Sequence, residues 1–253
     1  MNNDLFGITF PNMEMPVNNE TLGQSAEKVI CDLSGLDSSH LETRSNPEYE
    51  KILMPLISKA LKEIPKVVTH TGLERGSRGG QSKSKVDFIL AQNETLSVKT
   101  NKSANTMVCA PEVGQASWVV LEKYYSSLLK ENNIPYLDKK YYKQLVFNSI
   151  AKFTEVQINL LFSCDYLLWI FLLKEKFNYK IINVKNLQNF EWKTENFSSV
   201  KIDGSRKNLN DWNESIRFRY NNIPIIESQV HNHRSPPNKF RFDMKNLCKL
   251  LNL

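Results

Sequence analysis

Four polar residues between positions 87 and 112 have the types and spacing to do chemistry together. Asp87 opens a short apolar run, and Ser97 and Lys99 close the next one. Glu112 follows at the expected start of a helix. Two carboxylates and a lysine brought together are the set that magnesium-dependent phosphodiester hydrolysis requires, because carboxylates bind Mg²⁺ and an ammonium group stabilises growing negative charge.

The spacing predicts a β-hairpin that places Asp87 opposite Lys99. Residues 86–91 and 95–100 form two short, apolar and partly β-branched runs, which are typical of strands, and the polar residues between them suit a three-residue loop. Directly opposite residues have Cβ atoms about 4.5–5.5 Å apart, so the carboxylate and the ammonium group would be neighbours. Because side chains alternate along a strand, the other face is expected to form core. That face comprises Phe88, Leu90, Leu96 and Val98.

A helix is predicted to begin at Pro111, since proline is favoured at the first helical position. Glu112 would then lie in the first turn, where the helix dipole favours an anion. The expected buried stripe of this helix comprises Val113, Ser117, Val120, Tyr124 and Leu128. The preceding loop is long enough to return Glu112 to the strand ends, which would give a metal site of Asp87 and Glu112 with Lys99 beside it.

These residues resemble the PD-(D/E)XK nuclease superfamily, and within it the type II restriction endonucleases. In most members the position two before the lysine is Asp or Glu, whereas here it is Ser97. One subset, which cuts CCGG-like and CCNGG-like sites, carries Ser-x-Lys and moves the missing acid into the following helix. Here twelve residues, 100 to 111, separate Lys99 from Glu112, as in that subset. Val86 replaces the proline of the motif, and the Arg/Asp-rich recognition patch of the subset is absent.

The resemblance implies both an activity and a fold. The activity would be site-specific cleavage of both strands of double-stranded DNA with Mg²⁺, as one or two ions. Asp87 and Glu112 would bind the metal, and Lys99 would orient the attacking water. The fold would be α/β (mixed α+β), a restriction-endonuclease-like core with a central mixed sheet flanked by helices and a strand-rich C-terminal part that recognises DNA. A homodimer would match a symmetric DNA site, and a companion DNA methyltransferase would protect host DNA at that site.

Glu50 is a candidate third carboxylate. Asn46 and Pro47 predict the start of a helix, and Glu50 shares a face of that helix with Leu53 and Ile57. Some of the resembling enzymes carry an acid on their first core helix, which would make Glu50 a further metal ligand. The alternative is a solvated glutamate in the first helical turn, which is the commoner role for such a residue.

The chain is predicted to form one nuclease domain over residues 1–253. Residues 1–19 would be a polar N-terminal arm, and residues 20–176 would hold the helices and the catalytic hairpin core. Residues 177–253 would be a strand-rich region for DNA recognition, with strands at 180–184, 216–220, 223–230 and 239–242 and a closing helix from Asp243.

A long helical region is predicted from Asp138 to about Lys176, with a break near Phe153. It is apolar on more than one face, which makes it a candidate dimer interface. Its most apolar stretch, residues 158–173, is short and contains Asp165, so a buried helix is expected rather than a membrane span.

Composition agrees with a nucleic-acid partner. The net charge of +6 and the pI near 9.0 favour polyanions, and a hydrophobic content of 41% supports a sizeable core. The four cysteines are widely spaced, with no C-x-x-C pair, so they are expected to be reduced thiols rather than disulfides or zinc ligands. With no signal-peptide pattern at the N-terminus, a cytoplasmic protein without a membrane partner is expected.

Two polar segments are candidates for DNA contact, because Arg, Lys, Asn and Gln reach phosphates and base edges. The first precedes Asp87 and, with one lysine after the hairpin, contributes Arg75, Arg78, Gln81, Lys83, Lys85 and Lys102. The second, between two predicted strands, contributes His231, Asn232, His233, Arg234, Lys239 and Arg241.

Three alternatives stay open. A repair or junction nuclease of the same fold would share the catalytic residues but not the site specificity. A non-catalytic DNA-binding protein would use Asp87 and Lys99 as a structural ion pair. A serine hydrolase with Ser97 and Lys99 is the weakest alternative, because no loop that would stabilise an oxyanion accompanies the pair.

Overall fold

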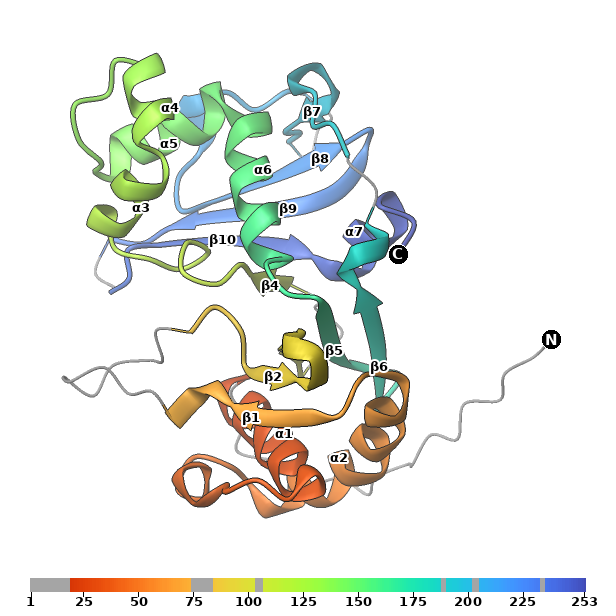
Figure 1. Cartoon of the computed structure of the whole chain (residues 1–253). Helices are drawn as coiled ribbons and strands as arrows, with labels where there is room; N and C mark the ends of the chain where they lie inside the picture. Colours follow the sequence, from red (N-terminus) through yellow and green to blue (C-terminus); the bar gives the residue numbers. More distant parts are fainter. Residues whose placement is uncertain (1–18, 74–83, 103–106, 188–189, 202–204, 233–234) are drawn as a thin grey trace. The chain divides into compact units, whose positions relative to one another are not determined.

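The computed structural model describes residues 19–73, 84–102, 107–187, 190–201, 205–232 and 235–253. The chain forms two compact units. Unit 1 combines residues 1–106 with 164–186, and unit 2 combines residues 107–163 with 187–253. Within the described residues each unit holds one five-stranded sheet (Figure 1).

The sheet of unit 1 is mixed. Its spatial order is β1-β2-β3-β5-β6, and β3 runs parallel to β5 while the other neighbours are antiparallel. The strands are β1 Val67–His70, β2 Phe88–Leu90, β3 Thr95–Asn101, β5 Tyr166–Leu173 and β6 Lys176–Asn183. Asp165 joins β5 to β3, because its carboxylate accepts from Thr95 N and Oγ1 at 2.8 and 2.9 Å.

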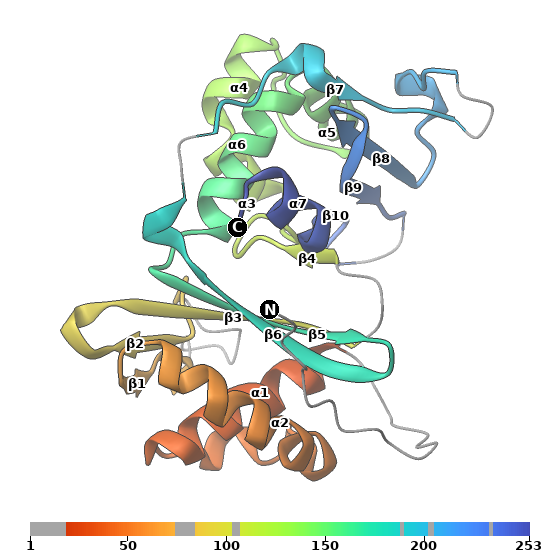
Figure 2. The same cartoon turned by 90° about the vertical axis from the view of Figure 1, so that its right-hand side faces the viewer.

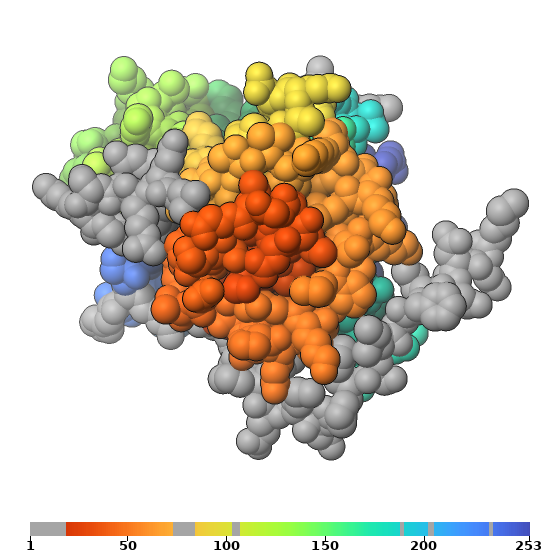
Figure 3. Space-filling view, turned by 60° about the horizontal axis from the view of Figure 1, so that its bottom comes forward, coloured from red at the N-terminus to blue at the C-terminus, as the bar shows by residue number. Residues whose placement is uncertain are grey.

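Two helices cover one face of this sheet (Figure 2). They are α1 Asn19–Ser34 and α2 Pro47–Ala60, and Asn46 caps α2 as predicted, accepting from Glu48 N and Tyr49 N. The apolar faces of the helices and the core face of the hairpin form one buried cluster, which confirms that Phe88, Leu90, Leu96 and Val98 point inward. The red and orange atoms at the centre of Figure 3 include the outer sides of α1 and α2.

The sheet of unit 2 is antiparallel, in the order β4-β10-β9-β8-β7. Its strands are β4 Met107–Cys109, β7 Phe197–Ser198, β8 Ser215–Tyr220, β9 Ile223–Val230 and β10 Asn238–Asp243. The strand predictions for 216–220, 223–230 and 239–242 are confirmed, and Asp243 caps the closing helix through Asn246 N. A mixed α/β protein with a strand-rich C-terminal part is therefore what the chain forms.

Five helices belong to unit 2 in the described residues. They are α3 Trp118–Tyr124, α4 Ser126–Glu131, α5 Lys139–Asn148, α6 Ile150–Leu161 and α7 Met244–Leu250. Aromatic contacts bind α6 to the sheet, since the ring of Phe153 lies 5.0 Å from that of Phe240 and stacks on Tyr125 at 4.1 Å. Short 3₁₀ turns occur at Ser39–Leu41, Leu61–Glu63, Thr71–Leu73, Ala91–Asn93, Val184–Asn186, Thr194–Asn196 and Leu209–Asp211.

The helical region predicted from Asp138 to about Lys176 is confirmed as far as Leu161 and is wrong beyond it. Asp138 does cap a helix, but the helix breaks at Ser149 and its successor ends at Leu161. Residues 166–173 form β5, so the run 158–173 is not one buried helix. A continuous apolar run has no period that separates a buried helix from a central strand, and β5 is central because it lies between β3 and β6 in its sheet. None of the described helices has the length and apolar character to span a bilayer.

Candidate functional site

The hairpin forms in a register that is two residues away from the predicted one. Phe88 pairs with Leu96 and Ile89 with Thr95, so Asp87 comes opposite Ser97 rather than Lys99. The loop consists of Ala91–Asn93, in which Gln92 and Asn93 both have positive φ. Because the shift is an even number of residues, every side chain keeps its predicted face. Asp87 and Lys99 therefore share a face as diagonal neighbours.

The Asp87 carboxylate is fixed by the neighbouring strand. Its Oδ2 atom accepts from Val98 N at 2.6 Å and from the Ser97 hydroxyl at 3.1 Å. Ser97 itself is only 2% exposed. In the described residues no hydrogen bond reaches Asp87 Oδ1, which leaves one oxygen of an oriented carboxylate for a ligand.

Lys99 lies on the same face without an ion pair to any described residue, Asp87 included. The thiol of Cys164, just before β5, lies near both charges. Burial raises the pKa of this thiol to about 12, although Lys99 and the Ser97 backbone N–H act in the opposite direction. The thiol is therefore neutral at physiological pH, and Lys99 keeps its charge free for a ligand.

Glu27 on α1 is a second carboxylate near Asp87, and the sequence analysis missed it. Its pKa is raised, mainly because burial desolvates the carboxylate and also because the charge of Asp87 acts on it. A hydrogen bond from His70 and the charge of Lys99 lower that pKa in turn. The signal in the sequence was a charged residue on the same helix face as the apolar residues Ile30 and Cys31, three and four positions further on. Both are fully buried in the structure.

His70 orients Glu27 from the end of β1. The imidazole Nε2 lies 3.1 Å from Glu27 Oε2, and Nδ1 lies 3.0 Å from His40 Nε2. With Glu27 ionised, His70 donates from Nε2 and accepts at Nδ1 from the His40 N–H. A Cβ at Gly72 would lie 2.5 Å from His70 Cε1, so only glycine leaves room for the ring in this position.

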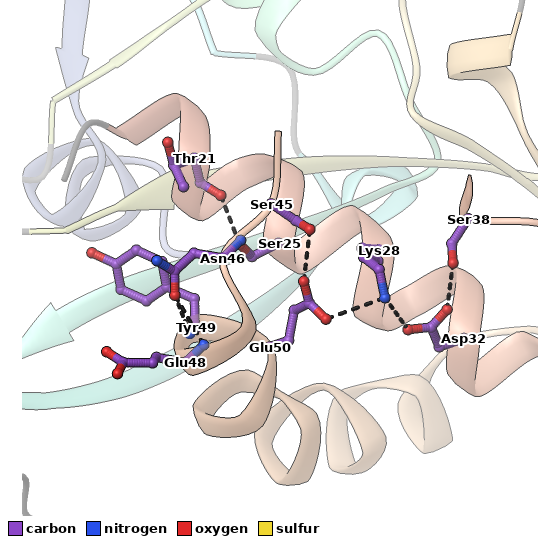
Figure 4. A network of polar contacts seen from close by, with 10 residues as sticks. All are labelled: Thr21, Ser25, Lys28, Asp32, Ser38, Ser45, Asn46, Glu48, Tyr49 and Glu50. Atoms are coloured by element: carbon purple, nitrogen blue, oxygen red, sulfur yellow. Dashed lines mark hydrogen bonds and ion pairs between the residues drawn. The ribbon is translucent and has the colours of Figure 1, made fainter. Parts of the chain in front are cut away.

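Glu50, the predicted third carboxylate, is engaged elsewhere on the two helices. Ser45 Oγ donates to Glu50 Oε1 at 2.6 Å, and Lys28 Nζ lies 3.2 Å from Oε2 (Figure 4). Lys28 also binds Asp32 at 2.9 Å, so Glu50 belongs to a network that joins α1 to α2. The acid on the first helix that faces the charges of Asp87 and Lys99 is thus Glu27.

Glu112 lies in unit 2, and the prediction that a helix begins at Pro111 is wrong. Residues 111–115 form turns, Glu112 has a left-handed backbone with φ of 61°, and α3 begins only at Trp118. Glu112 is exposed and accepts a hydrogen bond from the Tyr124 hydroxyl, which raises the pKa of Tyr124 to about 12.

The predicted buried stripe of this helix is shifted in consequence. Val113 and Leu128 are buried, but Ser117 and Val120 are exposed and Tyr124 is half-buried. The inward positions of α3 and α4 are Leu121, Leu128 and Leu129, with Tyr125 between the helices.

The side chains predicted to contact DNA are described only in part. Outside the described residues lie Arg75, Arg78, Gln81, Lys83, His233 and Arg234. In unit 1, Lys85 is exposed before β2, and the backbone N–H of Lys102 donates to Asn19 Oδ1 at 2.9 Å.

The remaining predicted DNA contacts belong to unit 2. Lys239 and Arg241 lie on β10, and Arg241 forms a 2.6 Å ion pair with Glu227. His231 donates its backbone N–H to Pro237 O at 2.7 Å, and Asn232 accepts a hydrogen bond from Lys139.

The donor set of unit 1 fits Mg²⁺ better than a softer metal. No group of three or more His, Cys, Asp or Glu side chains in the described part of the chain has metal-binding spacing. Mg²⁺, however, needs only one or two carboxylates, with water and substrate phosphate completing its octahedron. Asp87 and Glu27 each have one oxygen held by protein and one without a hydrogen bond from the described residues.

Comparison with known proteins adds no assignment: no protein-family model and no curated protein matches this chain.

Proposed function

We propose that this protein is a magnesium-dependent endonuclease of the PD-(D/E)XK type that cleaves double-stranded DNA at a specific site. One observation carries the proposal. A carboxylate fixed through Oδ2, that of Asp87, shares a sheet face with Lys99, which has no ion pair to a described residue, and the charges of both act on Glu27. The mixed sheet with helices on one face agrees with the core that the resemblance implies.

Each residue has a distinct role in the proposed reaction. Asp87 and Glu27 would hold Mg²⁺ in unit 1, and Glu112 stays a predicted ligand. Mg²⁺, when bound, would polarise the scissile phosphate and lower the pKa of a coordinated water. Lys99 would orient the attacking water and stabilise charge that grows on the phosphoryl oxygens. Ser97 is a positioning residue, because its hydroxyl binds Asp87.

The wider biological setting rests on the resemblance. Cleavage of both strands of a symmetric site is most simply done by a homodimer. A companion DNA methyltransferase would modify the same site in the host, and both proteins would act in the cytoplasm. The net charge of +6 supports a polyanionic substrate.

The deciding experiment incubates the full chain with long duplex DNA in Mg²⁺ or in EDTA. Wild type should give discrete fragments only with Mg²⁺. Asp87→Asn and Lys99→Ala should abolish cleavage, and Glu27→Gln should lower it at least about 100-fold, as expected when a ligand of the ion that stabilises transition-state charge is lost. Lys59→Ala, which removes an exposed lysine at the end of α2, is the matched control and should cut normally.

Two results would contradict the proposal. Cleavage by Lys99→Ala at the wild-type rate would exclude this site. DNA binding without cleavage in Mg²⁺ or Mn²⁺ would favour the non-catalytic DNA-binding protein. The structural ion pair that this alternative assumes is not formed, because Lys99 makes no salt bridge with Asp87. A smear without discrete fragments would favour a repair or junction nuclease of the same fold.

A further inference from the structure

The sheet of unit 2 has one apolar and one basic face. Along β8 buried and exposed residues alternate strictly, and β10 alternates between buried and half-buried residues. The buried face packs in the core through Ile216, Phe218, Tyr220, Phe240 and Phe242. The opposite face, called the basic face below, consists of Ser215, Arg217, Arg219, Glu227, Gln229, Lys239, Arg241 and Asp243.

The strand registers align this face in rows. Arg217 of β8 pairs with Glu227 of β9, which pairs with Arg241 of β10. The next row holds Ser215, Gln229 and Lys239 in the same order of strands. Neighbouring strands lie about 4.8 Å apart, so the side chains of these two rows are close together on one surface. Arg219 follows on β8, beyond a shift in the β8–β9 register between Phe218 and Arg219.

Both carboxylates of the face are engaged, and Asp243 caps α7 by accepting from Asn246 N at 3.2 Å. Glu227 accepts from Arg241 at 2.6 Å, from Gln229 at 3.0 Å and from Ser215 at 3.1 Å. Arg217, Arg219 and Lys239 have no ion pair with any described residue, and both arginines are exposed. Four cations, Arg217, Arg219, Lys239 and Arg241, against two carboxylates leave this surface with a net positive charge.

We propose that the basic face binds the phosphate backbone of duplex DNA, with Arg217 and Arg219 as the principal contacts. Three cations without an ion pair to any described residue, Arg217, Arg219 and Lys239, complement the phosphates of a duplex, and sheet surfaces are an established means of docking on DNA. The ion pair between Glu227 and Arg241 fixes the positions of these two side chains within the face. The inference deepens the proposed function, because it names the surface through which the substrate would be held.

The test measures binding separately from cleavage. The full chain is titrated into a fluorescent duplex in EDTA, where no cleavage occurs, at several salt concentrations. The double variant Arg217→Ala/Arg219→Ala should bind roughly tenfold more weakly, and its plot of log affinity against log salt should be shallower by about 2, or about one unit for each lost phosphate contact. The matched control Lys123→Ala/Lys130→Ala removes two exposed lysines from α3 and α4 and should keep the wild-type slope.

A conservative variant separates phosphate contact from base readout. Arg217→Lys/Arg219→Lys keeps both charges and should bind nearly as wild type does, since phosphate contact needs charge rather than the planar guanidinium. Unchanged affinity and salt slope in the alanine variant would overturn the proposal, as would preferential binding of an acidic protein by the same face.

The outcomes also distinguish this proposal from the proposed function. If Lys99→Ala binds DNA but does not cut, while the arginine variant loses binding, both stand. If wild type binds DNA through these arginines and never cuts, the proposed DNA contact is supported and the proposed nuclease activity is contradicted. If wild type cuts and the arginine variant binds DNA normally, the proposed nuclease activity is supported and the proposed DNA contact through the basic face is contradicted.

Discussion

The hydroxyl of Ser97 donates a hydrogen bond to Asp87 Oδ2 at 3.1 Å, from the position where most PD-(D/E)XK enzymes carry an acid. In the proposed metal site the serine would therefore not take the place of that acid; it fixes the carboxylate of Asp87, the proposed ligand. It shares this task with Val98 N, which binds the same oxygen at 2.6 Å. A buried serine that donates to a carboxylate is also poorly suited to be a nucleophile, which argues against a serine hydrolase.

Ser97→Ala should slow cleavage by no more than about tenfold, because one hydrogen bond contributes about 1 kcal/mol and Val98 N still orients Asp87. Single-turnover cleavage rates of Ser97→Ala and Asp87→Asn would be compared in Mg²⁺. A loss with Ser97→Ala as large as that with Asp87→Asn would show that the hydroxyl takes part in the chemistry.

Glu27→Gln should weaken the binding of Mn²⁺, whereas Glu50→Gln should not. Calorimetry, or the paramagnetic effect of Mn²⁺ on water, measures this binding. Glu27 carries the charge that interacts with Asp87, and Glu50 is bound to Lys28 and Ser45. This readout needs no DNA. Equal metal affinity in wild type and Glu27→Gln would remove Glu27 from the proposed site, and a large effect of Glu50→Gln would restore the original expectation.

His70 should act through Glu27. His70→Leu removes the N–H that binds Glu27 Oε2, whereas His70→Gln keeps a donor at a similar reach. We expect His70→Leu to weaken Mn²⁺ binding about tenfold or more, as loss of a hydrogen bond behind a metal ligand does, and His70→Gln to recover part of it.

A second variant tests the placement of the His70 ring rather than its chemistry. Gly72→Ala sets a methyl group 2.5 Å from His70 Cε1 and should displace the ring, so it should resemble His70→Leu in metal binding. Thermal melting of both variants separates this effect from unfolding. Wild-type affinity in His70→Leu would leave the histidine with a role in packing alone.

Alternation predicted the faces of the hairpin and of the C-terminal strands, because a period of two is visible in the sequence itself. It could not predict the register, since a shift of two residues keeps every face. The loop determines the register, because Gln92 and Asn93 adopt positive φ and the turn lies one residue closer to the N-terminus than predicted.

The acids of the candidate site were harder to predict, because their positions depend on contacts between distant segments. Glu27 and His70 are 43 residues apart and meet only when α1 packs on the sheet. Glu50 had the right residue type on a helix, but the ion pair with Lys28 depends on how two helices cross. The helix expected at Pro111 failed because a left-handed residue at Glu112 breaks the helical path.

Glu112→Gln should change the titration of one tyrosine. The hydrogen bond to the ionised Glu112 favours the neutral form of the Tyr124 hydroxyl and raises its pKa to about 12. A neutral amide at position 112 should lower that pKa toward the ordinary value for tyrosine, about 10. The difference in ultraviolet absorbance between wild type and variant above pH 9 measures this shift, and Tyr124→Phe should remove the difference. An unchanged titration would show that Glu112 is not bound to Tyr124 in solution.

Glu227→Gln should destabilise unit 2 at neutral pH by about 1–3 kcal/mol, the range for hydrogen bonds to charged groups. Burial raises the pKa of Glu227, but the charge of Arg241 and three hydrogen bonds outweigh it, so the pKa is lowered from 4.5. A lowered carboxyl pKa contributes stability that is present above the unfolded value and lost as the pH falls through the folded one. Urea unfolding of wild type and variant should therefore differ at pH 7 and converge in acid below pH 4.5.

The pair Glu131–Lys152 supplies the matched comparison for this prediction. It has the same 2.6 Å separation as Glu227–Arg241, but its side chains are 50% and 60% exposed, against 9% and 24% for the pair in the sheet. Water screens the exposed pair, so Glu131→Gln should change the free energy of unfolding by less than about 1 kcal/mol at either pH. Equal effects of the two substitutions would mean that the Glu227–Arg241 pair is solvated in solution. The pair would then not fix Arg241 on the basic face.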